Sequence, residues 1–173
     1  MASLLTALGL RASNPLTPAA SITATYLITN YVFAYLVLAS RTPKQHYGLD
    51  HNVSPREDLG KYGDAAVRSG KMTQKQLDQL RRLEGANANS IENYILFVAA
   101  MLFAQISGMA STQINATGLC YTVARFIYAG VYVFVDTPKL SQARGIMYWT
   151  GNFALFRLIW ISGNALNSKN VSA

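Results

Sequence analysis

The chain has 173 residues, enough for one domain, and 51% of them are apolar while only 13% are charged. This composition is too apolar for an ordinary soluble domain and predicts membrane helices joined by one sizeable polar loop. A net charge of +7 would suit nucleic acid, but the basic residues gather beside the predicted membrane helices, so we expect no nucleic-acid partner. The single cysteine, Cys120, excludes an internal disulfide.

The N-terminal part of the chain predicts an arm and then a membrane helix. A short apolar run precedes Arg11, which is the reverse of the order in a signal peptide, so we expect residues 1–18 to form an ordered or frayed arm. The next stretch, about 19–39, has no charge and is long enough to span a bilayer.

A polar loop follows over about 41–73 and holds both histidines. These histidines have no cysteine or carboxylate neighbours at zinc-ligand spacing, so we expect no metal site. Ser54 to Glu57 fits a capping box with proline at the first helical position, which predicts a short helix that Gly70 terminates.

The second membrane helix is predicted over about 74–107, with Thr73 and Gln76 as its capping box. Polar residues continue inside this helix on one face, at Arg82, Asn89, Glu92 and Asn93. An ionisable residue in a membrane helix costs several kcal/mol unless it faces a partner or a watery cavity. The pattern therefore indicates a functional site, and the alternative is a seam of hydrogen bonds between helices.

The third membrane helix is predicted over about 114–135 and carries Arg125, Tyr128 and Tyr132 on one face. Arg125 lies in the middle of the span, where an unpaired guanidinium is expensive, so we expect it to pair with Glu92. Such a pair is compatible with a structural role and with contact to a ligand.

The fourth helix is predicted over about 142–161, with Ser141 as its cap. Arg144 then lies in the first turn, where the helix dipole disfavours a cation. This placement indicates an anionic partner, or a charge tolerated at the surface. Arg157 lies about 20 Å further along the helix, and we expect its side chain to reach the opposite membrane interface or its lipid headgroups.

The distribution of basic residues predicts the topology of the chain. The loop after the first helix, with the start of the second, carries Arg41, Lys44, Arg56, Lys61, Arg68, Lys71, Lys75, Arg81 and Arg82. The link between the third and fourth helices adds two more basic residues, whereas the other side has few. We therefore expect both termini to be lumenal or exterior, and a cationic cytosolic mouth that suits a small anionic ligand.

Together these residues resemble a known family. The second helix has the pattern R-x-x-x-A-x-x-N-x-x-E-N, the third has A-R-x-x-Y-x-x-x-Y, and an arginine opens the fourth. In this order and spacing, over about residues 20–165, they resemble the membrane-associated proteins in eicosanoid and glutathione metabolism (MAPEG). The loop segment G-L-D-H-N-V-S-P-R-E-D-L-G-K-Y-G and the segment A-N-S-I-E-N-Y resemble the fungal branch.

The resemblance implies an all-α, integral membrane four-helix bundle that forms a homotrimer in the endoplasmic reticulum, with both termini lumenal. It implies a glutathione-dependent transferase or peroxidase that acts on a lipophilic electrophile approaching from membrane lipid. Glutathione, the implied cofactor, would lie between neighbouring subunits. The implied catalytic residues are Arg144, which stabilises the thiolate, and Tyr132. The implied glutathione-binding residues are Arg41, Arg82, Asn89, Glu92, Asn93, Arg125 and Tyr128.

The chain departs from the family pattern at two positions. Many members have an arginine where this chain has Gly85, and a histidine or glutamine where it has Asn87. The missing arginine removes a charge-assisted contact of about 1.5–3 kcal/mol, for which Arg81 or Arg82 could substitute. Two glutathione-independent alternatives therefore stand beside the transferase. They are an isomerase or cyclase of a hydrophobic metabolite and a non-catalytic lipid-binding protein.

Overall fold

A computed structural model describes residues 4–10 and 19–171 of the chain. The regular elements in these residues are all helical. They are α1 (Leu4–Ala7), α2 (Ala19–Val32), the π-helical segment η1 (Phe33–Val37), α3 (Arg41–His46), α4 (Asp58–Arg68), α5 (Gln74–Ile106), α6 (Ser111–Phe134) and α7 (Pro138–Val171).

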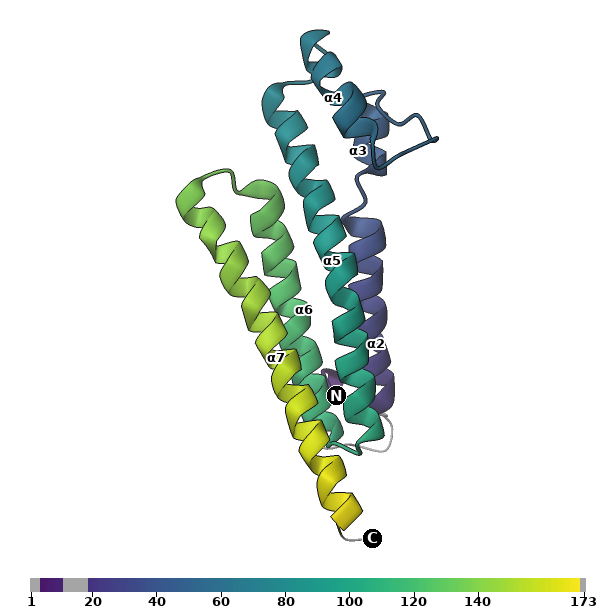
Figure 1. Ribbon diagram of the computed structural model, residues 1–173, viewed down its shortest axis with the longest axis vertical. Coiled ribbons are helices and arrows are strands. Elements are labelled where there is room, and N and C mark those ends of the chain that lie inside the picture. The colour runs from purple at the N-terminus through teal and green to yellow at the C-terminus, as the bar shows by residue number, and fades with distance from the viewer. Residues whose placement is uncertain (1–3, 11–18, 172–173) are drawn as a thin grey trace.

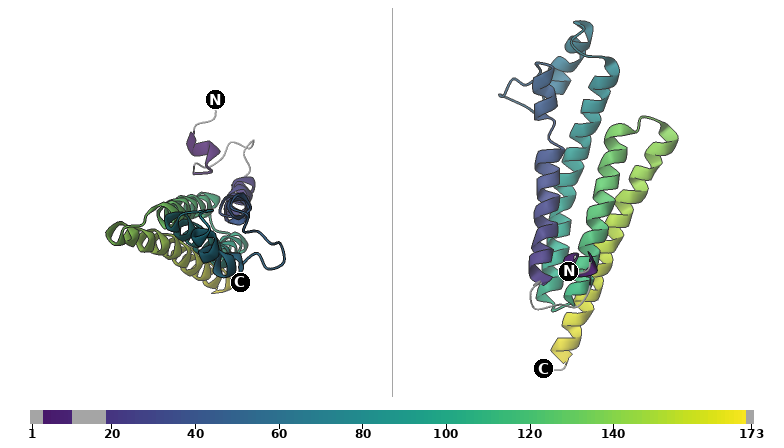
Figure 2. Two further views of the ribbon diagram at one scale, coloured as in Figure 1. Left: turned by 90° about the horizontal axis from the view of Figure 1, so that it is seen from above. Right: turned by 180° about the vertical axis from the view of Figure 1, so that it is seen from behind.

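Four long helices, α2, α5, α6 and α7, run side by side and make up the elongated body of the molecule (Figure 1). α5 extends beyond α6 and α7 at one end, and there it carries α3 and α4 (Figure 2). We call this end the loop end. α7 extends past its neighbours at the other end, where the C-terminus lies.

Three helical stretches are long and apolar enough to cross a membrane, Ile22–His46, Gln74–Ile106 and Ser111–Phe134. The chain is therefore a multi-pass membrane protein. The predicted fourth span does not meet the same criterion within residues 4–10 and 19–171, although α7 has 34 residues. Its lysines, arginines and asparagines lower the hydropathy of an otherwise apolar helix.

Local signals fix several helix ends as predicted. Thr73 and Gln76 form both hydrogen bonds of the capping box at the start of α5. Gly70 follows the end of α4 with φ of 75°, and Gly108 follows the end of α5 with φ of 70°. Residues with a side chain rarely adopt these positive φ angles, which explains why glycine occupies both positions.

Two predicted helix starts are wrong. α4 begins at Asp58 with Glu57 as its N-cap, so the Ser54 capping box does not form. α7 begins at Pro138, and Ser141 instead donates a hydrogen bond to the Pro138 carbonyl oxygen inside the first turn. Because α7 starts earlier than predicted, Arg144 lies in its second turn, where the unfavourable dipole is weaker.

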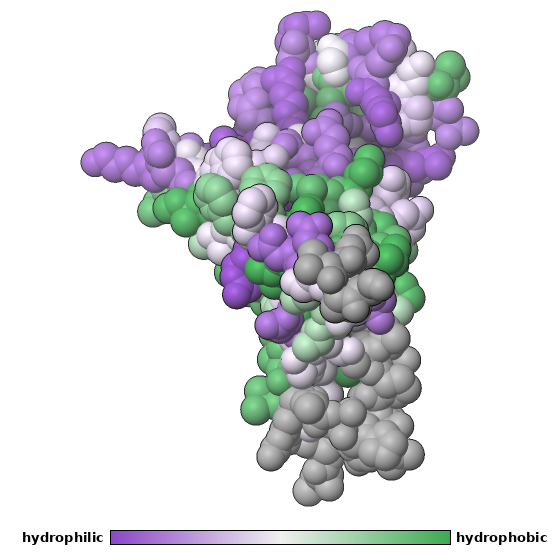
Figure 3. All heavy atoms as spheres, turned by 60° about the horizontal axis from the view of Figure 1, so that its bottom comes forward, coloured by the Kyte–Doolittle hydropathy of each residue, from purple (hydrophilic) through white to green (hydrophobic). Residues whose placement is uncertain are grey.

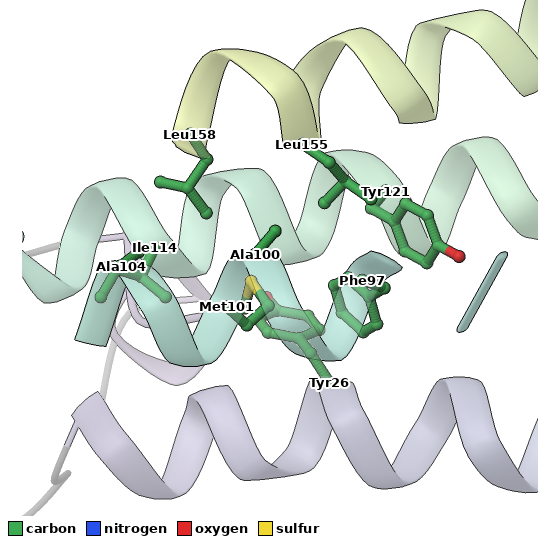
Figure 4. Close-up of a cluster of buried hydrophobic side chains, with 9 residues drawn as sticks. All are labelled: Tyr26, Phe97, Ala100, Met101, Ala104, Ile114, Tyr121, Leu155 and Leu158. Carbon is green, nitrogen blue, oxygen red and sulfur yellow. The ribbon is translucent and has the colours of Figure 1, made fainter. Parts of the chain in front are cut away.

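The membrane-embedded core lies where α2, α5, α6 and α7 meet. Figure 4 shows its buried side chains, among them Phe97, Met101 and Tyr121 between the helices. The Phe97 and Tyr121 rings stack with centroids 4.2 Å apart. On α6, Gly118 lies directly against Tyr26 and Met101, because a Cβ atom there would be 2.9 Å from either side chain. This contact lets α2 approach α6 closely.

A second apolar cluster folds the polar loop onto the protruding part of α5. It consists of Leu49, Leu59, Ala66, Met72, Leu77 and Leu80. Beside it the buried Lys44 ammonium donates to Glu84 at 2.9 Å and to the Pro55 carbonyl oxygen. In the space-filling view, hydrophilic residues gather at the loop end and apolar residues cover much of the body below it (Figure 3). The loop is therefore a packed cap on α5.

Candidate functional site

Two groups of polar side chains lie on either side of one exposed stripe of α5. The stripe consists of Ala88, Glu92, Ile95, Ala99, Leu102 and Ile106, which recur at helical spacing and are all exposed. On one side lies the α6–α7 cluster, which we define as Arg82, Gly85, Asn89, Arg125, Tyr128, Tyr132 and Arg144. On the other side lies a cleft beneath the cap, which we call the loop cleft.

Arg125 is buried in the α6–α7 cluster. Its Nη2 atom donates to the Asn89 carbonyl oxygen at 3.0 Å and to the Ser90 hydroxyl at 3.2 Å. Its guanidinium carbon lies 4.4 Å from the centroid of the Tyr128 ring, which is the geometry of a cation–π contact. Its Nη1 atom is buried and has no hydrogen-bond partner among the described residues.

The predicted ion pair between Arg125 and Glu92 does not form within the chain. Glu92 is exposed on the stripe of α5 and takes part in no hydrogen bond or ion pair with the described residues. Arg125 is buried whereas Glu92 is exposed, so the two side chains do not meet. The Asn89 carbonyl oxygen and the Ser90 hydroxyl accept the hydrogen bonds of Arg125 in place of the Glu92 carboxylate. Arg125 is therefore held by α5 and Tyr128, and the Glu92 carboxylate is left exposed without a partner among the described residues.

Arg144 and Tyr132 form a second contact within the α6–α7 cluster. The guanidinium carbon of Arg144 lies 4.3 Å from the centroid of the Tyr132 ring. Arg144 has no acidic partner or hydrogen bond in the part of the chain that the structure describes. A Cβ atom at Gly85 would lie 2.7 Å from the Tyr132 hydroxyl oxygen. Tyr132 therefore occupies the space beside α5 where a larger residue would project.

Arg82 and Asn89 complete this cluster from α5. Arg82 donates from Nε to the Val133 carbonyl oxygen at 3.3 Å. The Asn89 side-chain amide donates to the Gly85 carbonyl oxygen at 2.9 Å. The Asn89 backbone carbonyl oxygen accepts the hydrogen bond from Arg125 Nη2. The structure thus brings Arg125 together with five other predicted site residues from α5, α6 and α7. These are Arg82, Asn89, Tyr128, Tyr132 and Arg144.

Asn93, another predicted glutathione-binding residue, lies deeper in the bundle. Its amide donates to the Asn152 side-chain oxygen at 2.8 Å and accepts from the Tyr121 hydroxyl at 2.8 Å. All three residues are buried. This network links α5, α6 and α7, as the hydrogen-bond seam considered for the second helix would do.

The loop cleft has a volume of about 490 Å³ and opens between η1, α3 and α5. Its charged lining residues are Arg41, Lys44, Arg56, Glu84 and Glu92. Arg41 donates outward to Asp50 at 2.9 Å and to Asn52 at 2.7 Å. The hydrogen bond from Arg41 lowers the pKa of the Asp50 carboxyl below its ordinary value.

The wall of the loop cleft contains a π-helical segment that periodicity does not predict. Leu38 donates its backbone N–H to Phe33 rather than to Ala34. The Ala34 carbonyl oxygen instead accepts from the Asn87 side-chain amide at 2.7 Å. π-Helical turns are rare and occur often at functional sites. Only the unusual Asn87 at this position signals the contact in the sequence.

The two groups differ in charge balance. The α6–α7 cluster holds three guanidinium groups and no acidic side chain, so it favours carboxylates or a thiolate. The loop cleft mixes three basic and two acidic side chains and can receive a zwitterion. With Glu92 on the stripe between them, the residues present fit a small acidic peptide with a free amino group and a thiol.

Comparison with known proteins agrees with this architecture. The MAPEG family model matches residues 19–164, which cover α2 to most of α7. No curated protein and no solved structure is similar enough to count as a match. Because the matched segment is most of the sequence, this chain belongs to the MAPEG family.

Proposed function

We propose that the protein is a glutathione-dependent transferase or peroxidase that acts on a lipophilic electrophile in the endoplasmic reticulum membrane. The observation that carries the proposal is the unbalanced positive charge of the α6–α7 cluster. Among the described residues, Arg144 contacts only the Tyr132 ring, and Arg125 keeps a buried Nη1 atom without a hydrogen-bond partner. The family commonly uses glutathione, whose carboxylates and thiolate supply the missing negative charge.

The proposed roles follow from the position of each side chain. Glutathione supplies a thiol, whose pKa is ordinarily about 8.5. The Arg144 guanidinium, held over the Tyr132 ring, favours the thiolate and so keeps more of it ionised at neutral pH. Arg125 and Arg82 attract carboxylates, whereas Glu92, which is exposed and unpaired, receives an amino group. Asn89 and Tyr128 orient the peptide.

We further propose that the complete site forms between protomers of a homotrimer. The stripe of α5 presents Ala88, Ile95, Ala99 and Leu102, which are all exposed in the described part of the chain. Small and apolar residues on one face of a membrane helix are typical of close helix packing. Packing this stripe against a second copy would bring the loop cleft of one protomer, with Arg41 and Asn87, toward the α6–α7 cluster of the next.

The orientation in the membrane follows from the basic residues at the loop end. The positive-inside rule favours a cytosolic cap, and with α7 as a fourth crossing both termini would lie in the lumen, since both lie at the end away from the cap (Figure 1). Glutathione would then enter from the cytosol through a positively charged mouth. The electrophile would enter laterally from membrane lipid.

Isothermal titration of glutathione into the detergent-purified protein tests the proposal. We expect micromolar to low-millimolar binding and the ultraviolet absorbance of a thiolate. Arg144→Ala should abolish that absorbance, whereas Arg68→Ala, which removes an exposed arginine of α4, should leave it unchanged. Absence of binding at about 10 mM glutathione would exclude the glutathione-dependent enzyme.

One observation favours the glutathione-independent alternatives. The Tyr132 hydroxyl oxygen occupies the space beside Gly85, from which an arginine projects in many family members. If glutathione does not bind, the same cleft would serve an isomerase or cyclase of a hydrophobic metabolite, or a protein that presents lipid. Mass spectrometry of organic extracts from the purified protein would then identify the retained metabolite.

A further inference from the structure

Arg157 is a cation on the outward face of α7, far from the candidate site. Its side chain is exposed and has no hydrogen bond or ion pair among the residues that the structure describes. The adjacent residue, Leu158, points inward to the core beside Ala104 and Ile114 (Figure 4). These two residues belong to the last turn of α5 and the first turn of α6. Arg157 therefore lies level with the helix ends away from the cap.

No acidic side chain among the described residues is placed to neutralise Arg157. All eight acidic residues of the sequence lie between Asp50 and Asp136, and α7 has none. The acidic residue closest to this end is Glu92, which precedes Ala104 by a rise of about 18 Å along α5. A second copy of the chain has the same distribution and brings no carboxylate to this level. An anionic group from another molecule would supply a counter-charge at this level.

The surroundings of Arg157 are aromatic and apolar. Trp160 is 72% exposed and Phe153 is 62% exposed, and both share the outward face of α7 with Arg157. Trp149 and Ile146 continue this face toward the cap, and the Trp149 and Phe153 rings lie 5.4 Å apart. Beside them a shallow hollow of about 610 Å³ is lined by Gly145, Ile146, Trp149 and Phe153 among others.

We propose that this outward face of α7 binds a membrane phospholipid in the leaflet away from the cap. The Arg157 guanidinium binds the phosphodiester through paired N–H donors, which match phosphate geometry. Trp160 lies at the headgroup boundary, where tryptophan is enriched. One acyl chain lies along Phe153 and Trp149 and ends in the hollow at Gly145 and Ile146.

The dimensions of the face agree with one leaflet. Half of the hydrocarbon core of a bilayer is about 15 Å thick. From Arg157 the rise along α7 to Trp149 is about 12 Å, and to Ile146 it is about 17 Å. An acyl chain anchored at Arg157 therefore reaches the hollow at the middle of the membrane. This binding site is separate from the proposed glutathione site, and neither depends on the other.

Native mass spectrometry of the detergent-purified protein tests the lipid site. The probes are dioleoylphosphatidylcholine, dioleoylglycerol with the same chains and no phosphate, and inorganic phosphate alone. We expect the phospholipid to be retained and the diacylglycerol to be lost. Arg157→Gln should weaken phospholipid retention at least about tenfold, Arg157→Lys should preserve part of it, and the matched control Arg68→Gln should have no effect.

Several results would overturn the proposal. Equal retention of diacylglycerol would show that the phosphate is not recognised, and displacement of the lipid by inorganic phosphate would indicate a free-anion site. A change in oligomeric mass in Arg157→Gln, with lipid retention intact, would assign Arg157 to a contact between protomers. If Arg157→Gln does not fold, the lipid site is tested instead by the fluorescence of Trp160 in the Trp149→Phe variant. Brominated phosphatidylcholine should quench it more strongly than brominated diacylglycerol.

Discussion

Asn93 connects three helices through one side-chain amide. It donates to Asn152 of α7 and accepts from Tyr121 of α6, each at 2.8 Å. Leucine at position 93 keeps a similar volume but removes both hydrogen bonds. The Tyr121 hydroxyl and the Asn152 side-chain oxygen would then each lose this hydrogen bond while buried, which costs about 1–3 kcal/mol.

We therefore expect Asn93→Leu to lower the thermal unfolding midpoint of the detergent-purified protein, measured by circular dichroism. Asn164→Leu, which replaces an exposed asparagine of α7, is the matched control and should leave the midpoint nearly unchanged. An unchanged midpoint for Asn93→Leu, combined with weaker glutathione binding, would instead show that Asn93 contacts the ligand. Its glutathione-binding role stays a prediction until this comparison is made.

The residue types of the site were predictable from the sequence, but their partners were not. Helical spacing places Arg125 and Tyr128 on one face, and they do form a cation–π contact. The same spacing cannot show how α6 is rotated relative to α5. Because of this rotation, Arg125 donates hydrogen bonds to Asn89 and Ser90 rather than pairing with Glu92. A pair between two helices depends on tertiary packing, which periodicity does not contain.

At the scale of a single element, α6 contains two glycines in different surroundings. A Cβ atom at Gly118 would lie 2.9 Å from both Tyr26 and Met101, whereas one at Gly130 would have no neighbour within 4 Å. Alanine in a helix is ordinarily more stable than glycine by about 0.5–1 kcal/mol. At Gly118 the buried Tyr26 ring cannot easily move away, so the clash outweighs this gain.

We expect Gly118→Ala to lower the thermal unfolding midpoint and Gly130→Ala to raise it or leave it unchanged. Both variants add one methyl group to the same helix, so the gain in helix propensity is the same in both and cancels in the comparison. Calorimetry in one detergent gives the two midpoints. Equal shifts would show that α2 does not depend on the small residue at position 118 for its packing.

Helix ends were predictable where one strong signal stood alone. Thr73 starts α5 as expected because its capping box has no competing proline. At the start of α7, Pro138 favours the first helical position, and this signal outweighs Ser141 three residues later. At Ser54 the chain forms turns before α4, although the residues fit a capping box. The π-helical segment depends on Asn87, a residue of another helix, so local sequence could not predict it.

The cap has a pH-sensitive contact between Arg41 and Asp50. The hydrogen bond from Arg41 lowers the pKa of Asp50, so this contact stabilises the fold above the ordinary aspartate pKa. The stabilisation is lost as the pH falls through the lowered pKa. We expect ¹³C NMR of labelled aspartate carboxyls to show Asp50 titrating below the ordinary range, with little change between pH 6 and pH 8.

Arg41→Gln should return the titration of Asp50 toward the ordinary range, because the first and largest cause of the shift is then absent. Arg68→Gln removes an arginine that has no acidic partner among the described residues and should leave the titration as it is. If Arg41→Gln leaves the Asp50 pKa unchanged, the Gln45 and Asn52 contacts hold the carboxylate instead.

At the scale of the whole molecule, the exposed stripe of α5 separates two polar groups, the loop cleft and the α6–α7 cluster. In the proposed trimer each polar group supplies part of the site, because the loop cleft contains Glu92 and Arg41 whereas the α6–α7 cluster contains Arg144 and the buried Arg125. Three of the four predicted membrane spans, and the order of the helices, were evident from hydropathy, whereas α7 does not meet the criterion for a span within the described residues. The separation of the predicted site residues into two groups was not evident, because it depends on which side of α5 each residue occupies.

A bulky residue on the stripe should therefore break the assembly and the site together. We expect native mass spectrometry of the purified protein to give three times the chain mass of 18.9 kDa. Ala99→Trp places an indole where a second α5 would pack, and it should lower the mass and weaken glutathione binding in parallel. Ala24→Trp adds the same indole at an exposed position of α2 and should change neither. A variant that is monomeric but still binds glutathione normally would show that one chain holds a complete site, which would place the ligand within the α6–α7 cluster alone.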